Sequence, residues 1–169
     1  MCRAALGGAP MVVGGGGAGA MVQYAEVELT AMGGWPTFIG VGRAGLDVGR
    51  EWANQMAEFW GMSSGDGDLC HAGQRTNWAE RQNFTQGDTL GLLLDCAQGT
   101  LAYYKNGERL GVAAEGLTGE LCWAAALHEK GGSLRLTAKL PPAGVYGRDW
   151  QRQHHIPFTW VGRGRRVGV

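Results

Sequence analysis

Two glycine-rich stretches are the first candidates for chemistry in this sequence, because a GxGxxG loop can hold a pyrophosphate. The pattern occurs at residues 14–19 and again at 40–45, and the second match follows an apolar run. Asp66 stands at about the distance expected of a ribose-binding acid. A dinucleotide site also needs a helix that begins at the third glycine. Gly49 disfavours such a helix, so we interpret 40–45 as a strand and a turn. Among the functions that this sequence could serve, a cofactor-dependent enzyme therefore has the least support.

Metal-binding and nucleophilic patterns are equally incomplete. Asp66 and Asp68 resemble part of a calcium loop, but the remaining oxygen ligands are missing, so we interpret them as a solvated acidic turn. His71 lies beside Cys70, yet four converging zinc ligands cannot be assembled. The sequence has no GxSxG, HExxH or Walker pattern. We predict no metal, no cofactor and no catalytic residues.

Composition favours one globular domain rich in tight turns. The 169 residues include 31 glycines, 44% hydrophobic and 18% charged residues. Glycine at this level opposes long helices, and no apolar run is long enough for a transmembrane helix. The cysteines (2, 70, 96 and 122) show no CxxC spacing, which is typical of reduced thiols inside the cell, in the cytoplasm or nucleus.

Charge is distributed unevenly along the chain. Residues 21–140 hold nine Lys/Arg against fourteen Asp/Glu, a net of −5, whereas residues 141–169 hold five Arg against one Asp, a net of +4. An acidic body argues against nucleic acid as the partner. We divide the chain into a flexible, disordered Gly/Ala-rich lead (1–20), a folded domain (21–140) and a basic C-terminal extension (141–169). The extension is apolar at 156–160, and whether it packs back on the domain or docks a partner stays open.

Short apolar runs separated by turn residues predict an all-β protein. Strands are expected at 22–29, 37–41, 60–62, 69–71, 89–94, 100–105, 108–113, 121–127 and 134–137. The segment 46–59 is looser, with room for a helical turn. Asn106–Gly107 indicates a type I′ hairpin, since both positions of that turn need a positive φ. The fold class is an antiparallel β-sandwich.

The aromatic residues can be assigned by their neighbours. Trp60, Trp78 and Trp123 adjoin predicted strands, so we expect them in the core. Tyr103 and Tyr104 point to opposite faces of one strand, so we expect one to pack and the other to be exposed.

The block 87–113 resembles the signature of SPRY domains: an apolar strand of the "GLLLD" type, then "GTLxFYxNG", then "LGVAF", whose phenylalanine is replaced here by Ala114. Residues 24–29 resemble the family's "YYEVxI" strand, and 38–42 its "IGVG" strand. The resemblance covers roughly 21–138, but the Gly/Ala-rich lead replaces the family's usual Trp-containing segment, which leaves the first strands without a sequence match. It implies a bent, SPRY-like sandwich of concanavalin-like jelly-roll architecture that binds a protein or short peptide without catalysis, through loops at one end.

The resemblance gives the location of the binding residues but not the contacts. The residues expected in those loops are Arg43, Arg50, Trp52, His128, Glu129 and Lys130. We expect a monomeric interaction module with no membrane contact, serving as a substrate receptor or scaffold in a ubiquitin-ligase or chromatin-type complex. The alternative is a lectin-like carbohydrate-binding sandwich, supported by Trp52 and the acidic turn 66–68.

Overall fold

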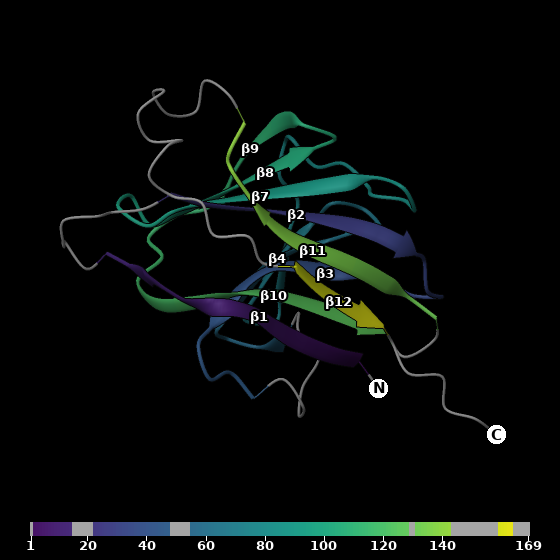
Figure 1. The fold of residues 1–169 in the computed structure, drawn as a ribbon, viewed down its shortest axis with the longest axis horizontal. Coiled ribbons are helices and arrows are strands. Elements are labelled where there is room, and N and C mark those ends of the chain that lie inside the picture. Colours follow the sequence, from purple (N-terminus) through teal and green to yellow (C-terminus); the bar gives the residue numbers. More distant parts are fainter. Residues whose placement is uncertain (1, 15–21, 48–54, 129–130, 143–158, 164–169) are drawn as a thin grey trace.

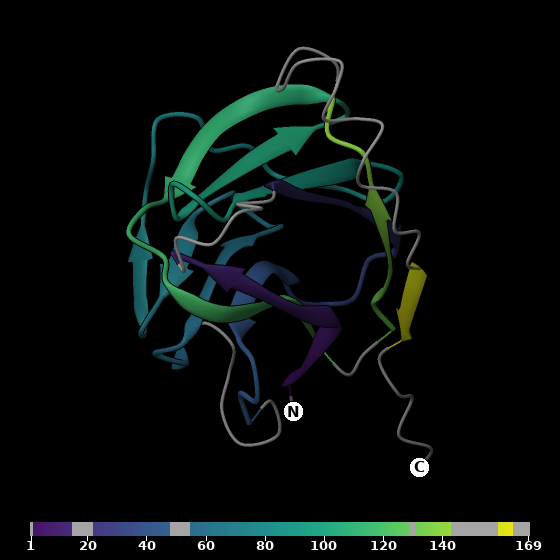
Figure 2. The same ribbon diagram turned by 60° about the vertical axis from the view of Figure 1, so that its left-hand side comes forward.

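Two six-stranded antiparallel sheets face each other in the computed structural model (Figures 1 and 2). The structure describes residues 2–14, 22–47, 55–128, 131–142 and 159–163. Sheet A has the strand order β1-β10-β3-β4-β5-β6, and sheet B has the order β12-β11-β2-β7-β8-β9. Every strand pair is antiparallel, which confirms the predicted all-β sandwich.

The strands of sheet A are β1 (Cys2–Val13), β3 (Phe38–Arg43), β4 (Phe59–Ser63), β5 (Leu69–His71), β6 (Gln74–Thr76) and β10 (Gly119–His128). Those of sheet B are β2 (Val22–Ala31), β7 (Thr89–Asp95), β8 (Thr100–Lys105), β9 (Glu108–Ala114), β11 (Ser133–Lys139) and β12 (Thr159–Arg163). No helix in the described residues has the length and apolar character needed to span a membrane.

β7 is apolar along almost its whole length because both of its faces are buried. Leu90, Leu92 and Leu94 point into the main core between the sheets, whereas Leu93 joins a separate buried cluster on the outer face of sheet B. That outer cluster also contains Tyr24 and Tyr104, whose rings meet edge to face at 5.8 Å. A strand with neighbours on both sides and apolar contacts on both faces needs no polar alternation.

Tyr104 corrects the sequence-based expectation for the tyrosine pair. Tyr103 is fully buried between the sheets, and Tyr104 is 3% exposed on the other face. Alternation along β8 was therefore predicted correctly, but the exposure of one ring was not. The centre of the outer face of sheet B is buried as well, so both tyrosine rings pack against other side chains.

The N-terminal segment also differs from expectation. Cys2–Val13 is a twelve-residue strand and not a disordered lead, and it pairs with β10 from Cys2↔His128 to Val13↔Gly119. The pairing is interrupted by a register shift between Gly7 and Met11. Met11 and Val13 contribute buried side chains to the main core. Residues 15–20, the rest of the predicted lead, lie outside the described part.

The hairpin of β8 and β9 confirms the sharpest local prediction. Asn106 and Gly107 both have positive φ, at 51° and 85°. The Asn106 side chain also accepts a hydrogen bond from the Thr89 backbone N–H and donates one to Asp88, both at 2.9 Å. The turn is thereby attached to the start of β7.

Candidate functional site

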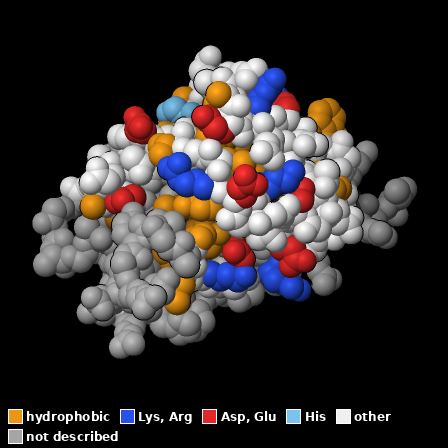
Figure 3. All heavy atoms as spheres, turned by 90° about the horizontal axis from the view of Figure 1, so that it is seen from above, with side chains coloured by type: hydrophobic (Ala, Val, Ile, Leu, Met, Phe, Trp, Pro, Cys, Tyr) orange, Lys and Arg blue, Asp and Glu red, His pale blue; other side chains and the backbone are white. Residues whose placement is uncertain are grey.

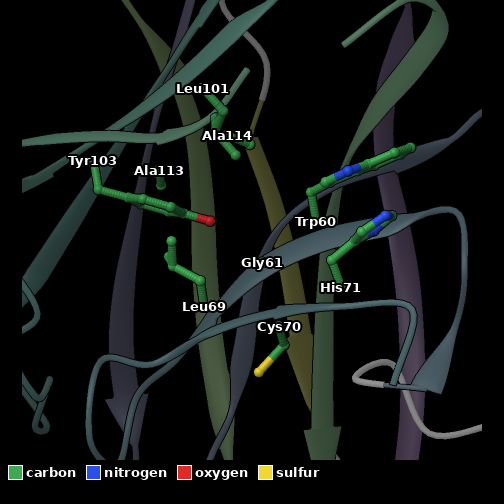
Figure 4. Close-up of a pocket in the computed structure, with 9 residues that line it drawn as sticks. All are labelled: Trp60, Gly61, Leu69, Cys70, His71, Leu101, Tyr103, Ala113 and Ala114. Carbon is green, nitrogen blue, oxygen red and sulfur yellow. The ribbon is translucent and has the colours of Figure 1, made fainter. Parts of the chain in front are cut away.

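A small cleft opens between the two sheets, where β4 and β5 of sheet A face β8 and β9 of sheet B (Figure 4). Its volume is about 40 Å³. The lining is mainly apolar: Trp60, Gly61, Leu69, Cys70, His71, Leu101, Tyr103, Ala113 and Ala114. Because both walls belong to rigid sheets, the shape of the cleft is set by the fold and not by a loop.

An aromatic stack forms one side of the cleft. The Trp60 indole and the His71 imidazole lie nearly parallel, with centroids 4.7 Å apart and an interplanar angle of 13° (Figure 4). The two residues are direct register partners of β4 and β5. His71 Nδ1 lies 3.0 Å from the Phe59 carbonyl oxygen and donates to it, which fixes the ring against Trp60.

Arg43 approaches the same indole from β3, the strand on the other side of β4. Its guanidinium carbon lies 5.7 Å from the centroid of the Trp60 ring, within the range of a cation–π contact. Arg43 Nε donates to Glu58 at 2.8 Å, and another guanidinium nitrogen donates to the Thr118 carbonyl oxygen. The predicted binding residue Arg43 therefore positions Trp60 and the β9–β10 loop through contacts inside the chain.

The polar side chains that reach the cleft have a fixed hydrogen bond or a fixed protonation state. The Tyr103 hydroxyl, directed toward the cleft in Figure 4, donates to the Ile39 carbonyl at 2.8 Å, and burial raises the pKa of Tyr103 above its ordinary range. Burial also raises the pKa of the Cys70 thiol to about 11, so this thiol stays protonated at neutral pH. These properties suit a binding surface of fixed shape.

The acidic turn considered as a calcium loop is neutralised by arginines. Arg75 forms ion pairs with Asp66 and, at 3.4 Å, with Asp68, and Arg81 contacts Asp68 at 3.1 Å. Burial raises the pKa of Asp66, but hydrogen bonds from the Asp68 backbone N–H and from Arg75 outweigh it and hold the pKa below its ordinary value. No group of three potential metal ligands occurs among the described residues.

The second GxGxxG match is part of a strand. Gly40 and Gly42 lie in β3, which pairs with β10 on one side and β4 on the other. A Cβ on Gly40 would overlap the Trp60 carbonyl oxygen and come within 2.6 Å of the Gly61 Cα. Gly40 is thus required by close packing of β3 on β4, and the match has a structural cause.

The predicted site residues do not form one surface. Arg43 pairs with Leu121 near the start of β10, whereas His128 is the last residue of the same strand. Seven residues of extended chain separate the two ends by about 23 Å. Arg50, Trp52, Glu129 and Lys130 lie outside the described residues. The expectation that Arg43 and His128 share one end of the sandwich is therefore wrong.

The cleft itself was not predicted from sequence. Trp60 and Trp78 were expected in the core, and both pack against it as half-buried residues, Trp60 at the cleft. Trp123 is buried in the core as expected. A usable signal existed, because Trp60 and His71 are equidistant from the centre of the turn 63–68. A hairpin around that turn pairs them directly.

The comparisons with known proteins agree with this architecture. A family model described as the SPRY domain matches residues 23–140. The SPRY domain-containing SOCS box protein 3 of Xenopus laevis is 32% identical over 99 residues, which are 54% of this chain and 27% of the relative. The Xenopus tropicalis protein of the same name is 31% identical over 99 residues, with the same coverage. The chain thus matches about a quarter of the length of these relatives.

Solved structures extend the likeness to most of the chain. The SPRY domain of human HERC1 superposes with a TM-score of 0.64 at 20% identity, covering 86% of this chain and 85% of that one. Another human SPRY domain gives 0.60 at 16% identity, covering 80% and 83%. With the family model spanning most of the sandwich, the chain belongs to the SPRY domain family.

Proposed function

We propose that this domain is a non-catalytic recognition module that binds a segment of another protein at the end of the sandwich where Arg43, Trp60 and His71 lie. The observation that carries the proposal is the apolar cleft between the sheets, with the Trp60–His71 stack on one side. A preformed concave surface with an aromatic side chain is typical of a binding site for a partner side chain.

The larger context is part of the same proposal. The curated relatives are SOCS box proteins, and we propose that this domain supplies the recognition surface of a substrate receptor or scaffold, as in a ubiquitin-ligase or chromatin-type complex. The buried free thiols Cys70, Cys96 and Cys122 fit a reducing compartment such as the cytoplasm or nucleus. We propose a monomer in solution, and light scattering after size-exclusion chromatography tests that state.

Partners other than proteins have less support on the described surface. Acidic and basic side chains alternate on the face seen from above in Figure 3, whereas nucleic-acid binding uses a basic face. Carbohydrate binding in the manner of a lectin needs an aromatic face free for the sugar, but Arg43 and His71 contact the indole of Trp60 from its two neighbouring strands.

A photo-crosslinking experiment tests the proposal. A photoreactive amino acid replaces His71 at the cleft or, as the matched control, Glu108 at the opposite end of β9. Cells expressing the whole chain are irradiated, and the adducts are identified by mass spectrometry. We expect protein adducts at position 71 that are absent at position 108. Equal labelling at both positions would place the interface elsewhere, and labelling at neither position would remove the interaction function.

A further inference from the structure

The outer face of sheet B carries a buried apolar cluster. Its members are Val22, Tyr24, Leu93, Ala102 and Tyr104, with exposed fractions between 3% and 7%. Sheet A packs against the opposite face of sheet B (Figure 2), and the outward face of a sandwich normally carries polar residues in contact with water. The cluster is therefore covered by something other than the facing sheet.

Three members of the cluster lie in one row of cross-strand neighbours. Lys139, the last residue of β11, pairs with Tyr24 of β2, which pairs with Leu93 of β7. Leu93 in turn pairs with Ala102 of β8. The burial ends on the next strand, because Val112 of β9, the partner of Ala102, is 40% exposed. The covered area thus extends from β11 across three strand spacings, about 14 Å.

The adjacent row begins where β12 joins the sheet. Thr137 of β11 pairs with Thr159, the first residue of β12, on one side and with Glu26 on the other. The row continues through Gly91 to Tyr104. The Tyr104 hydroxyl is buried without a hydrogen-bond partner among the described residues, which indicates that the covering is apolar at this point and excludes water.

The next row along the strands marks the limit of the covered area. It contains Arg135 and Glu28, which are register partners. Their side chains are 53% and 46% exposed. The burial is therefore confined to the part of the outer face that adjoins the end of β11 and the start of β12.

The chain leaves the sheet and returns to it at this same place. After Lys139, Pro141 is buried and Pro142 is half-buried, so the chain still contacts the protein after β11 ends. Residues 143–158 lie outside the described residues, and Thr159 is back on the sheet opposite Thr137. These 16 residues can span up to about 50 Å, more than the roughly 30 Å needed to reach β8 and come back.

We infer that residues 143–158 of this chain cover the outer face of sheet B, with their apolar side chains over Tyr24, Leu93 and Tyr104. This part of the C-terminal extension then belongs to the folded sandwich, and the face beneath it is closed to partner proteins. The inference is independent of the ligand of the cleft. The large apolar residues that the segment offers are Val145, Tyr146, Trp150, Ile156 and Phe158.

Site-specific photo-crosslinking of the whole chain tests the covering. A diazirine analogue of leucine replaces Leu93 or, as the matched control, Val112, the exposed residue at the end of the same row. Melting temperatures establish that both labelled proteins keep the native fold. After irradiation of the dilute purified protein, mass spectrometry identifies the crosslinked peptides. We expect position 93 to crosslink to peptides from 143–158 at every protein concentration, and position 112 to give little or none of this product.

Two sets of serine substitutions measure how the segment packs. The first set removes its large apolar side chains: Val145→Ser, Tyr146→Ser, Trp150→Ser, Ile156→Ser and Phe158→Ser. The second set is the matched polar control: Arg148→Ser, Gln151→Ser, Arg152→Ser, Gln153→Ser and His154→Ser. The apolar set should lower the melting temperature by about 5–10 °C and increase the binding of a dye that fluoresces on apolar surfaces. The polar set should shift the melting temperature by less than about 2 °C.

Other results would overturn the inference in distinguishable ways. Crosslinks from position 93 to another protein, or to a second copy of the chain in proportion to concentration, would assign the face to an intermolecular interface. Reaction of position 93 with water alone would show an uncovered face. Equal melting temperatures for the two serine sets would mean that the segment does not pack through its apolar side chains. None of these outcomes bears on the cleft, which crosslinking at position 71 tests separately.

Discussion

The Tyr103 hydroxyl of sheet B donates a 2.8 Å hydrogen bond to the carbonyl oxygen of Ile39 in sheet A. Both residues are buried, so this bond connects the two sheets inside the core next to the cleft. Tyr104, the next residue, offers a natural comparison, because its buried hydroxyl has no hydrogen-bond partner among the described residues.

Tyr103→Phe should lower the free energy of unfolding by about 1–3 kcal/mol, because the Ile39 carbonyl loses its buried donor. Tyr104→Phe keeps the same ring on the other face and removes a hydroxyl that is buried without a partner, so it should be neutral or stabilising. Urea denaturation of the two variants measures the difference. Equal effects would show that the hydrogen bond of Tyr103 to Ile39 contributes no net stability.

Asp88 should make stability depend on pH below about 4. Hydrogen bonds from the Asn106 side chain and the Thr85 backbone lower the Asp88 pKa from 3.8 to about 2. Because the folded pKa lies below the unfolded one, the stabilisation is complete above pH 3.8 and is lost as the pH falls through 2. Denaturation midpoints between pH 5 and 2 should fall less steeply in Asp88→Asn. Glu108→Gln, an exposed site on β9, should keep the slope of the natural protein.

Gly40→Ala should destabilise the fold by about 1–3 kcal/mol, since the new methyl group meets the backbone of β4. Gly34→Ala is the control, because no atom of the described part of the chain lies within 4 Å of a Cβ at that position, and it should stay within about 0.5 kcal/mol. Thermal unfolding compares the two. A neutral Gly40→Ala would mean that β3 and β4 can separate without loss.

Arg43→Ala should destabilise the cleft end, since it removes the Glu58 pair, the bond to Thr118 and the contact with Trp60 together. The ion pair is part of this loss and should be small, about 0.2–1 kcal/mol, because both side chains are partly exposed. A double-mutant cycle with Glu58→Gln measures the coupling energy of the ion pair. Arg43→Lys tests whether a positive charge without the guanidinium geometry is sufficient for stability. Coupling well above this range would indicate a more strongly desolvated pair.

Three cysteines should react slowly in the native state. Burial raises the pKa of Cys70 and of Cys96 to about 11 and also raises that of Cys122, which leaves little thiolate at neutral pH. Titration with a thiol-specific reagent before and after denaturation, followed by peptide mapping, measures the rate at each position. Fast native labelling of Cys70 would show that the β4–β5 hairpin opens readily.

Local sequence patterns predicted the central strands of the fold and missed strands at the edges of sheet A. Asn106–Gly107 and the apolar run of β7 could be interpreted from sequence, because a few adjacent residues determine the turn type and the burial of the strand. The β1 sequence is rich in Gly and Ala and has little intrinsic strand preference, so its structure comes from pairing with β10, far along the chain. The three residues of β6 are all exposed and show no hydrophobic period.

The candidate site was harder to predict, because most of its contacts join residues that lie far apart in the sequence. Arg43 and His128 both adjoin strands, but only the register of β10 shows that they lie at opposite ends. The partners that hold Arg43 are Glu58 and Thr118, and Thr118 is 75 residues away in sequence. Trp60 and His71 are the exception, since a single hairpin joins them.

The outermost strand beside β10 in sheet A and the one beside β11 in sheet B come from opposite ends of the chain, and both fall outside residues 23–140, the span recognised by the family model. An expression clone trimmed to that span would lose β1 and β12 and leave the backbone groups of β10 and β11 unpaired. Open strand edges of this kind recruit other chains. The span that the family model recognises is therefore shorter than the two complete sheets, and a trimmed clone should aggregate where the longer chain remains dispersed.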